Sequence, residues 1–517
     1  MNTKPLSITK NFILLGFILA KFLLQYLLNN SFYDLHRDEY LHLDQPNHLA
    51  WGYLSVPPVT SWISYTISFL GGSIFWIRFF PAMFGALTML VVWKAMEELK
   101  GTLFALILGS TCMLLSVFVR LNFLYQPNSL DVLSWTLFYF ILIKYFNTEN
   151  PKWLYVATVV FALGFLNKYN IVFMLIGVLP AMLLAGHENF FIRREFYISI
   201  LLGLILIAPN LLWQYNNHFP VVSHLKELSA SQLVKVNRWD FVKDQIFYFI
   251  GALPVIIASL YGVLFYRPLK KFKFFFWSFF ITLLVFIYFR AKSYYAMGVY
   301  PIYFALGATF IGSIQIKWIR YVKPVFIAIP VIFYILLYRI VFSIEKPREI
   351  ISNAHVYKKY GLLRWEDGKD HILPQDFADM LGWKELAIKV DAICAHFPAN
   401  EPVFILCDNY GQAGAINYYA KHIKTKAVAF NADYINWFDL NTKIENVIRV
   451  KVFEDSGDEL EGTGPLFETS YVAGSITNPL AREYKTTIFV FKNAKIDINE
   501  RLRAEMKKER LLRGLLP

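Results

Sequence analysis

Charged residues are scarce in this sequence. Asp, Glu, Lys and Arg make up 17% of the 517 residues, whereas 56% are hydrophobic and 18% are aromatic. A soluble protein of this length carries roughly a quarter charged residues. The shortfall argues against a soluble enzyme and predicts a membrane protein.

Cysteines are few, and the common metal and nucleophile motifs are missing. Cys112, Cys394 and Cys407 cannot build a disulfide framework, so one disulfide or none is expected. The sequence has no H-E-x-x-H or C-x-x-C spacing, no glycine-rich phosphate loop after a strand and no G-x-S-x-G turn. His42 and His48 lie near several acids but on either side of a proline. We therefore favour the absence of a metal site.

The net charge of +13 would also suit a protein that binds nucleic acid. The basic residues, however, lie mostly in short clusters between apolar segments, which is the pattern of cytoplasmic loops in membrane proteins. The sequence therefore predicts contact with membrane lipid and no nucleic-acid partner.

Apolar segments follow one another through the first two thirds of the chain. They lie near 11–28, 72–93, 102–119, 129–146, 152–166, 169–186, 196–213, 244–266, 272–289, 294–313 and 324–343. Most are long enough to cross a bilayer as a helix. We expect a polytopic α-helical membrane domain over residues 1–344, with about eleven transmembrane helices.

The short connections that are rich in Lys and Arg all fall on one side of this arrangement. They are "KAMEELKG", "FIRREF", "YRPLKKFK" and "IKWIRYVKP". Basic loops mark the cytoplasmic side of a membrane protein. The first outer loop, residues 29–71, and everything after residue 344 are then extracytoplasmic.

Residues 345–517 have the charge content of a soluble domain. "EPVFILC", "TKAVAFN", "ENVIRVKVF" and "TTIFVFK" are typical of short buried strands, and "GWKELAIKVDAICAHF" and "GQAGAINYYAKHI" of amphipathic helices between them. This alternation predicts an α/β domain with a mainly parallel sheet. "DNYGQAG" lies at a strand-to-helix turn, where α/β proteins often bind ligands, although ordinary turn chemistry is the favoured explanation.

The first outer loop gathers carboxylates among aromatic residues. The stretch "SFYDLHRDEYLHLDQPNHLAWGYLSVPPVTSW" contains Asp34, Asp38, Glu39 and Asp44. Partly apolar surroundings disfavour the charged form of Asp38, so we expect a raised pKa that suits a general base. The alternative is that Asp38 and Glu39 are solvated acids at a helix start, where the helix dipole stabilises them.

Two further clusters lie at the ends of predicted spans on the same outer side. Asp131 stands at the start of a span, where an unpaired charge costs several kcal/mol, so it faces a cavity or a partner unless it is an ordinary acid of a helix start. "FRAKSYYAMGVYP" presents Arg290, Lys292, Tyr294 and Tyr295. Two cations and two phenols suit a phosphate, and snorkelling beside an aromatic belt is the alternative.

Taken in order, these motifs resemble those of a known group of membrane enzymes. After the acidic pair come "GYLSVPPVTSW", "IRFFPAMFGALTML", "QPNSLDVLSW", "PNLLWQYNNHFPVVSHLKEL" and "RAKSYYAMGVYPIYFALGA". They are similar to segments of the polyprenyl-phosphate-sugar-dependent glycosyltransferases of the GT-C superfamily, which include protein O-mannosyltransferases and the aminoarabinose transferase of lipid A. The likeness covers most of residues 30–310, and "DMLGWKELAIKV" and "DNYGQAGAINYY" extend it into the C-terminal domain.

The resemblance implies a GT-C-like fold and an inverting transfer without an enzyme nucleophile. By this resemblance Asp38 is the catalytic base, Glu39 is its neighbour, and Asp131 helps to shape the site. Lys292 and the tyrosines after it match the segment near the lipid phosphate. The resemblance requires no cofactor and leaves dependence on a divalent metal open.

One residue departs from the family pattern. Relatives often carry a polar or charged residue just before the Pro-Pro pair, where this chain has Val56. If that residue touches phosphate in the relatives, then Arg290, Lys292 or Arg78 takes a larger share of the phosphate here.

The expected reaction moves a sugar from a polyprenyl (undecaprenyl) phosphate carrier to a hydroxyl of a glycan, lipid or protein, at the outer face of the bacterial inner membrane. One alternative is a transporter or flippase of lipid-linked sugars, which predicts acids deep in several spans and internal repeats. Asp131 is the one good candidate for such an acid, and no repeat is found. The other alternative, an inactive scaffold of the same fold, is kept open by Val56.

Overall fold

The computed structural model describes residues 4–341, 345–398 and 401–515. Its elements form two compact units, each built from segments that are distant in the sequence. The first unit comprises residues 1–29, 72–211 and 230–344, and the second comprises 30–71, 212–229 and 345–517. The predicted domain boundary at residue 344 lies outside the described residues and stays a prediction.

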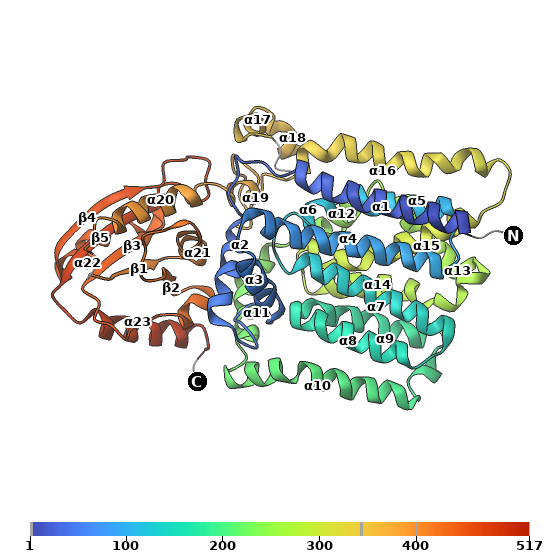
Figure 1. The fold of residues 1–517 in the computed structure, drawn as a ribbon, viewed down its shortest axis with the longest axis horizontal. Coiled ribbons are helices and arrows are strands. Elements are labelled where there is room, and N and C mark those ends of the chain that lie inside the picture. The colour runs from blue at the N-terminus through green and yellow to red at the C-terminus, as the bar shows by residue number, and fades with distance from the viewer. Residues whose placement is uncertain (1–3, 342–344, 399–400, 516–517) are drawn as a thin grey trace. The chain divides into compact units, whose positions relative to one another are not determined.

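The first unit is built from helices (Figure 1), most of which are apolar. A helix satisfies its backbone polar groups internally, as an apolar medium requires. The helices are α1 (Lys4–Leu27), α4 (Ile74–Glu98), α5 (Leu103–Leu114), α6 (Phe118–Leu121), α7 (Asn128–Thr148), α8 (Lys152–Asn167), α9 (Val172–Leu184), α10 (Arg194–Asn216), α12 (Arg238–Tyr248), α13 (Leu253–Phe265), α14 (Phe274–Tyr288), α15 (Tyr300–Ser313) and α16 (Ile319–Val341). Among their buried core residues are Trp93, Trp135 and Tyr303.

The lengths of these helices show which of them suit a bilayer. Six of the described helices are long and apolar enough to cross a membrane, and the pair α12–α13, bent by 98°, makes seven if it counts as one span. The other apolar helices have 10–17 residues, fewer than the roughly 20 that a perpendicular span needs. The chain is a polytopic α-helical membrane protein, and the total of about eleven spans stays a prediction.

A five-stranded sheet is the centre of the second unit. In spatial order it contains β2 (Val428–Ala429), β1 (Val403–Cys407), β3 (Asn446–Lys451), β5 (Thr487–Ala494) and β4 (Phe467–Ser475). β1 pairs in parallel with β2 and β3, whereas β5 is antiparallel to β3 and β4. The sheet is therefore mixed: the predicted parallel pairing holds for β1, β2 and β3, and β5 runs opposite to the other four strands. The sequence pattern misses β4 because most of its residues are exposed or half-buried, so it lacks the apolar run of a buried strand.

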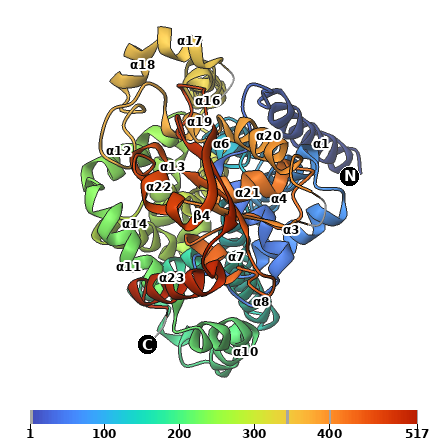
Figure 2. The same cartoon turned by 90° about the vertical axis from the view of Figure 1, so that its left-hand side faces the viewer.

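Helices cover both faces of this sheet. In Figure 2, α22 (Glu459–Thr463) and α23 (Ile498–Leu512) lie on one side of it, and α20 (Trp383–Cys394) and α21 (Tyr410–Tyr419) lie on the other. The remaining α-helices are α2 (Arg37–Asp44), α3 (Val59–Phe69), α11 (Pro220–Ser231), α17 (Pro347–Ser352), α18 (Ala354–Lys359) and α19 (Gln375–Ala378). The 3-10 helices of four or more residues are η1 (Gln45–His48), η5 (Arg267–Phe272), η6 (Ser293–Val299) and η7 (Ala432–Asn436). Since α2 contacts both α3 and α21, the loop 30–71 folds together with the C-terminal α/β domain.

A cavity of about 240 Å³ lies between α23 and the sheet, with an apolar floor. The cations on its wall are paired with acids of the same domain: Arg449 with Asp408, Lys451 with Glu459 and Arg501 with Glu505. The charges of this cavity are thus compensated within the domain.

Candidate functional site

The start of α2 is fixed by a capping box that includes Glu39. The His36 side chain accepts a hydrogen bond from the backbone N of Asp38 (3.2 Å), and Glu39 Oε2 accepts one from the backbone N of His36 (2.7 Å). Such reciprocal bonds satisfy backbone donors that have no partner within the helix. The side chain of Glu39 is fully buried, so its carboxylate serves to form the helix on which Asp38 stands.

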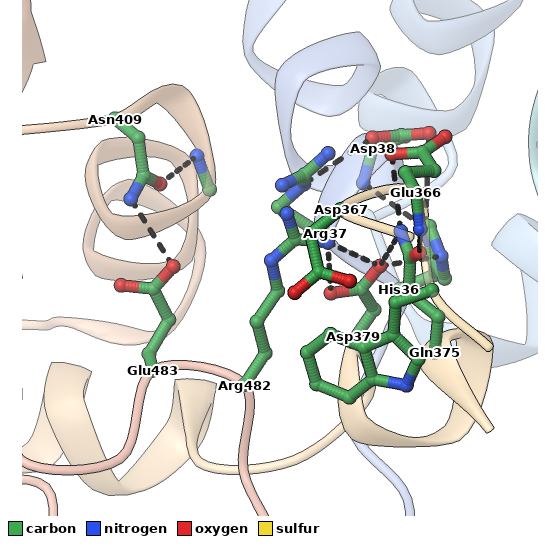
Figure 3. A network of polar contacts seen from close by, with 12 residues as sticks. His36, Arg37, Asp38, Glu366, Asp367, Gln375, Asp379, Asn409, Arg482 and Glu483 are labelled. Atoms are coloured by element: carbon green, nitrogen blue, oxygen red, sulfur yellow. Dashed lines mark hydrogen bonds and ion pairs between the residues drawn. The ribbon is translucent and has the colours of Figure 1, made fainter. Parts of the chain in front are cut away.

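Asp38 is surrounded by positive and hydrogen-bonding groups (Figure 3). The Tyr410 hydroxyl donates a 2.7 Å hydrogen bond to Asp38 Oδ1, and Arg37 Nε lies 3.6 Å from the same oxygen. His36 Nδ1 lies 3.9 Å from Oδ2, and 37% of the Asp38 side chain stays exposed. The carboxylate is therefore both held in place and open to a small polar group.

The pKa of Asp38 moves in the direction opposite to the sequence-based expectation. Burial does raise it, but the positive charges of His36 and Arg37 and the hydrogen bond from Tyr410 outweigh burial and lower the pKa of Asp38 below its ordinary value. The expected rise is wrong because neighbouring cations stabilise the charged form of the carboxyl more than burial destabilises it. Asp38 is an anion throughout the physiological pH range.

A second set of contacts ties the segment before α2 to the C-terminal domain. Asp379 is buried and accepts hydrogen bonds from Arg482 Nη1 at 3.1 and 3.2 Å, and its carboxylate lies 3.7 Å from His36 Nε2. The backbone N of Arg37 donates to the Asp379 carbonyl oxygen (3.1 Å), and that of Asp34 to the Met380 carbonyl oxygen (2.7 Å). Asp379, Arg482 and Tyr410 were not predicted from the sequence, although Asp379 lies in "DMLGWKELAIKV" and Tyr410 in "DNYGQAGAINYY".

The far end of α2 is held in the same way. Asp44 Oδ2 accepts hydrogen bonds from Asn417 Nδ2 (2.5 Å) and from the Tyr434 hydroxyl (2.9 Å). Asp433 Oδ2 accepts one from Gln45 Nε2 (3.1 Å), and its Oδ1 accepts one from the backbone N of Leu54 (2.7 Å). Both ends of the helix that carries Asp38 are therefore bonded to the C-terminal domain.

Asp433 makes the stability of this unit depend on pH. Burial raises the pKa of Asp433 to about 6, against the two hydrogen bonds that it accepts. Its ionisation therefore costs stability when the pH rises above the unfolded value of about 4. In Asp433→Asn this cost is absent. We compare the Tm difference between the variant and wild type at the two pH values. This difference should be more positive at pH 7.5 than at pH 5, by roughly 3 °C or more.

Thermal unfolding of the full chain in detergent at the two pH values measures this effect. Asp439→Asn is the matched control, because Asp439 is exposed and its side chain accepts a hydrogen bond from the backbone N of Asn441, in its own turn. An Asp433→Asn variant with the same pH dependence as wild type would show that Asp433 does not titrate in this range.

In the first unit, Asp131 is a buried acid with two donors. Trp135 Nε1 donates to its Oδ1 (3.0 Å), and Asn170 Nδ2 donates to its Oδ2 (2.9 Å) and to the Tyr295 carbonyl oxygen (2.9 Å). The carboxylate thus joins α7 to the break between α8 and α9 and to the segment that carries Tyr295. Asp131 thus faces hydrogen-bond partners and also lies in the first turn of α7, as the alternative expects, so its part in a site stays a prediction.

Lys168 is a cation that the sequence analysis missed. It lies at the end of α8, donates to Asn128 Oδ1 (2.6 Å), and its ammonium lies 4.5 Å from the ring centre of Tyr295 and 5.3 Å from that of Tyr294. Lys292 adds a second positive charge within interaction range. A charged residue in "FLNKYNIVF", between two apolar helices, was the available signal.

The two arginines predicted to bind phosphate make contacts elsewhere. Arg290 Nη1 donates to the Val234 carbonyl oxygen (3.2 Å). Arg78 Nη1 donates to the Phe123 carbonyl oxygen (2.9 Å), and its guanidinium lies 4.3 Å from the centre of the Phe123 ring. Lys168, Tyr294 and Tyr295 form one cluster, and the contacts of Arg290 and Arg78 described above lie outside it.

No group of three or more His, Cys, Asp or Glu side chains is arranged to hold a metal ion within residues 4–341, 345–398 and 401–515. The cysteines Cys112, Cys394 and Cys407 are free thiols.

Comparisons with known proteins relate these elements to characterised ones. Residues 55–213 match the family described as dolichyl-phosphate-mannose-protein mannosyltransferase. The lipid A galacturonosyltransferase RgtD of Rhizobium johnstonii is 26% identical over 325 residues, which cover 60% of this chain and 65% of the relative. The chain thus spans just under two thirds of the length of that relative.

Solved structures show the same fold over nearly the whole chain. ArnT of Cupriavidus metallidurans bound to undecaprenyl phosphate superposes with a TM-score of 0.60 at 11% identity, over 92% of this chain and 97% of ArnT. The apo state of the same protein gives 0.59 at 12% identity, over 93% and 98%. At this identity the likeness establishes the fold.

Proposed function

We propose that the chain is an inverting glycosyltransferase of the GT-C superfamily. It moves a sugar from a polyprenyl-phosphate carrier to an acceptor hydroxyl. The observation that carries the proposal is the Asp38 carboxylate, which is kept ionised and partly exposed at the start of α2. The mannosyltransferase family match and the likeness to ArnT bound to undecaprenyl phosphate support the donor class.

In the proposed reaction Asp38 accepts the proton of the acceptor hydroxyl, and the oxygen of that hydroxyl attacks the anomeric carbon of the sugar. The carbon–oxygen bond to the phosphate breaks, the sugar inverts, and the polyprenyl phosphate leaves with the bonding electrons. A carboxylate of low pKa is a weak base, so it takes the proton late, when the attacking oxygen has become acidic. A sugar phosphate already has a good leaving group, so no covalent intermediate on the enzyme is needed.

We assign the departing phosphate to the cations of the first unit. Lys168 and Lys292, with the hydroxyls of Tyr294 and Tyr295, offer charge and hydrogen bonds that stabilise a developing anion. Arg290 and Arg78 remain candidates for the same role, although each already donates to a backbone carbonyl. For Asp131, the proposed role is to hold the break between α8 and α9 in place beside these tyrosines.

The proposal includes the cell compartment and the acceptor. The resemblance implies the bacterial inner membrane, and the basic connections predict that loop 29–71 and the C-terminal domain are extracytoplasmic. The acceptor is a glycan, a lipid or a protein, and the match to a lipid A galacturonosyltransferase makes a lipid A-type acceptor the first to test.

Transfer of radiolabelled sugar from undecaprenyl-phosphate donors to a membrane extract tests the proposal. We expect the purified full chain to move label from one donor to an extractable acceptor, with release of undecaprenyl phosphate. Movement of an intact labelled donor across vesicle membranes, without such release, would instead indicate a flippase. If no donor gives transfer or translocation, the proposal is contradicted.

A further inference from the structure

Tyr410 belongs to the C-terminal domain, yet its hydroxyl donates a hydrogen bond to Asp38 in the loop 30–71. The position of Tyr410 is set by the start of α21. Asn409 accepts hydrogen bonds from the backbone N of Gly411 (3.0 Å) and of Gln412 (3.1 Å), and its amide donates to the buried Glu483 (3.2 Å). The favoured explanation of "DNYGQAG", ordinary turn chemistry, is therefore confirmed for Asn409. Tyr410 has a further contact that turn formation does not require.

The ring of Tyr410 is held as firmly as its backbone. The Arg37 guanidinium carbon lies 5.0 Å from the ring centre, a cation–π contact. Gly411 permits this approach, because a Cβ at that position would lie 2.5 Å from Arg37 Cγ and 2.8 Å from the Trp383 ring. With the backbone capped and the ring stacked, the hydroxyl has one direction, and that direction is toward Asp38 Oδ1.

We infer that Tyr410 is a positioning residue for Asp38: its hydroxyl holds the carboxylate in one orientation, so that the C-terminal domain completes the site of the base. This inference rests on the proposed function, since it presumes that Asp38 acts as the base. It gives the C-terminal domain a part in the reaction itself, in addition to any part in recognising the acceptor.

The groups around Asp38 determine what the loss of one hydroxyl changes. His36, Arg37 and His42 act on the carboxylate from its own loop, Tyr410 acts from α21, and Asp379 lies behind His36. Without the hydroxyl Arg37 remains beside the carboxylate, so Asp38 stays charged at neutral pH but loses the bond that holds it in one orientation. Its pKa rises toward the ordinary value, because one hydrogen bond to the charged form is lost.

Tyr410→Phe removes the hydroxyl and keeps the ring on Arg37. We expect kcat to fall about tenfold or more, with KM for the donor within about threefold, and the acidic limb of the pH–rate profile to shift to higher pH. Tyr419→Phe is the matched control: Tyr419 lies on the same helix, and its hydroxyl contacts Tyr40 of the same loop (3.4 Å) rather than Asp38. Its kcat and pH profile should equal those of wild type.

The pH dependence of thermal unfolding provides a second readout that needs no transfer activity. A depressed Asp38 pKa stabilises the fold above the unfolded pKa, and this stability is lost as the pH falls. In Tyr410→Phe the folded pKa of Asp38 lies closer to its unfolded value, so acidification should remove less stability than in wild type. In an Asp38→Asn background the same Tyr410 change should leave the pH dependence unaltered.

The outcomes separate the inference from the function on which it rests. If wild type transfers sugar and Tyr410→Phe matches it in kcat and pH profile, the inference is overturned and the proposed function stands. If wild type transfers no sugar, the proposed function fails. The thermal unfolding data then test the hydrogen bond alone: if Tyr410→Phe has the same pH dependence of unfolding as wild type, Tyr410 does not stabilise the Asp38 carboxylate. If both Phe variants lose activity equally, helix packing is responsible and the specific role of Tyr410 is excluded.

Discussion

Asp38→Asn is expected to lower kcat for sugar transfer by roughly 100-fold to 10,000-fold, the range that a general base contributes. The substitution is nearly isosteric, and Asn Oδ1 still accepts the hydrogen bond from Tyr410, so the start of α2 should keep its geometry. What is lost is the capacity to take a proton. KM for the lipid donor should therefore stay within about threefold, since the donor phosphate is assigned to other residues. Initial rates at saturating donor, in detergent, measure both quantities.

Asp34→Asn is the control for this experiment. Asp34 lies in the same loop and its Oδ2 accepts a hydrogen bond from the backbone N of Lys384 (3.1 Å), which an Asn oxygen can also accept. It should transfer sugar at a rate close to wild type. Equal rates for Asp38→Asn and wild type would remove Asp38 from the mechanism. Equal losses in both variants would indicate a general effect on the loop.

Gly414→Ala should disrupt the site through α21, at its contact with α2. A Cβ at this position would lie 2.7 Å from Tyr40 Cβ and 3.0 Å from the Tyr40 backbone carbonyl carbon. These atoms belong to the rigid part of α2, so the helix must move away from α21, at a typical cost of about 1–3 kcal/mol for an overpacked contact. We expect an apparent Tm several degrees lower and a fall in kcat of at least tenfold, because the same shift lengthens the bond from Tyr410 to Asp38.

Gly462→Ala is the matched control, since a Cβ there would meet no atom within 4 Å. Gly462 lies in the short helix α22, where alanine is favoured over glycine. Tm and transfer of this variant should equal or slightly exceed those of wild type. A Gly414→Ala protein that kept both its Tm and its activity would show that α2 and α21 are not in the tight contact described.

Much of the architecture follows from composition and hydropathy alone. Low charge and repeated apolar segments predict the helical membrane domain, and the break at Lys168 falls within the predicted pair of spans around "FLNKYNIVF". The alternation after residue 345 identifies β1, β2, β3 and β5, because buried strands are apolar on both faces. The edge strand β4 is missed because only one of its nine residues is buried, which leaves no apolar signature.

The candidate site was only half visible in the sequence. The motif around Asp38 pointed to a base, but the direction of its pKa depends partly on Tyr410, which is 372 residues away. A single sequence carries no record of such a pairing. Glu39 illustrates the same limit. Its role in the capping box depends on the local backbone, and the sequence offers a helix start only as the alternative to a catalytic role.

The loop 30–71 is synthesised long before the residues that give it its structure. Asp44 and Asp433 depend on hydrogen bonds between segments about 390 residues apart, and every intervening membrane helix is made first. During synthesis the segment that carries Asp38 therefore cannot form these contacts at first. Contacts of such high sequence separation form last and slowly. A nascent or truncated chain that ends before α21 carries the carboxylate but lacks Tyr410 to hold it. Under the proposed mechanism, a chain that lacks its last quarter would therefore carry the base without the residues that position it.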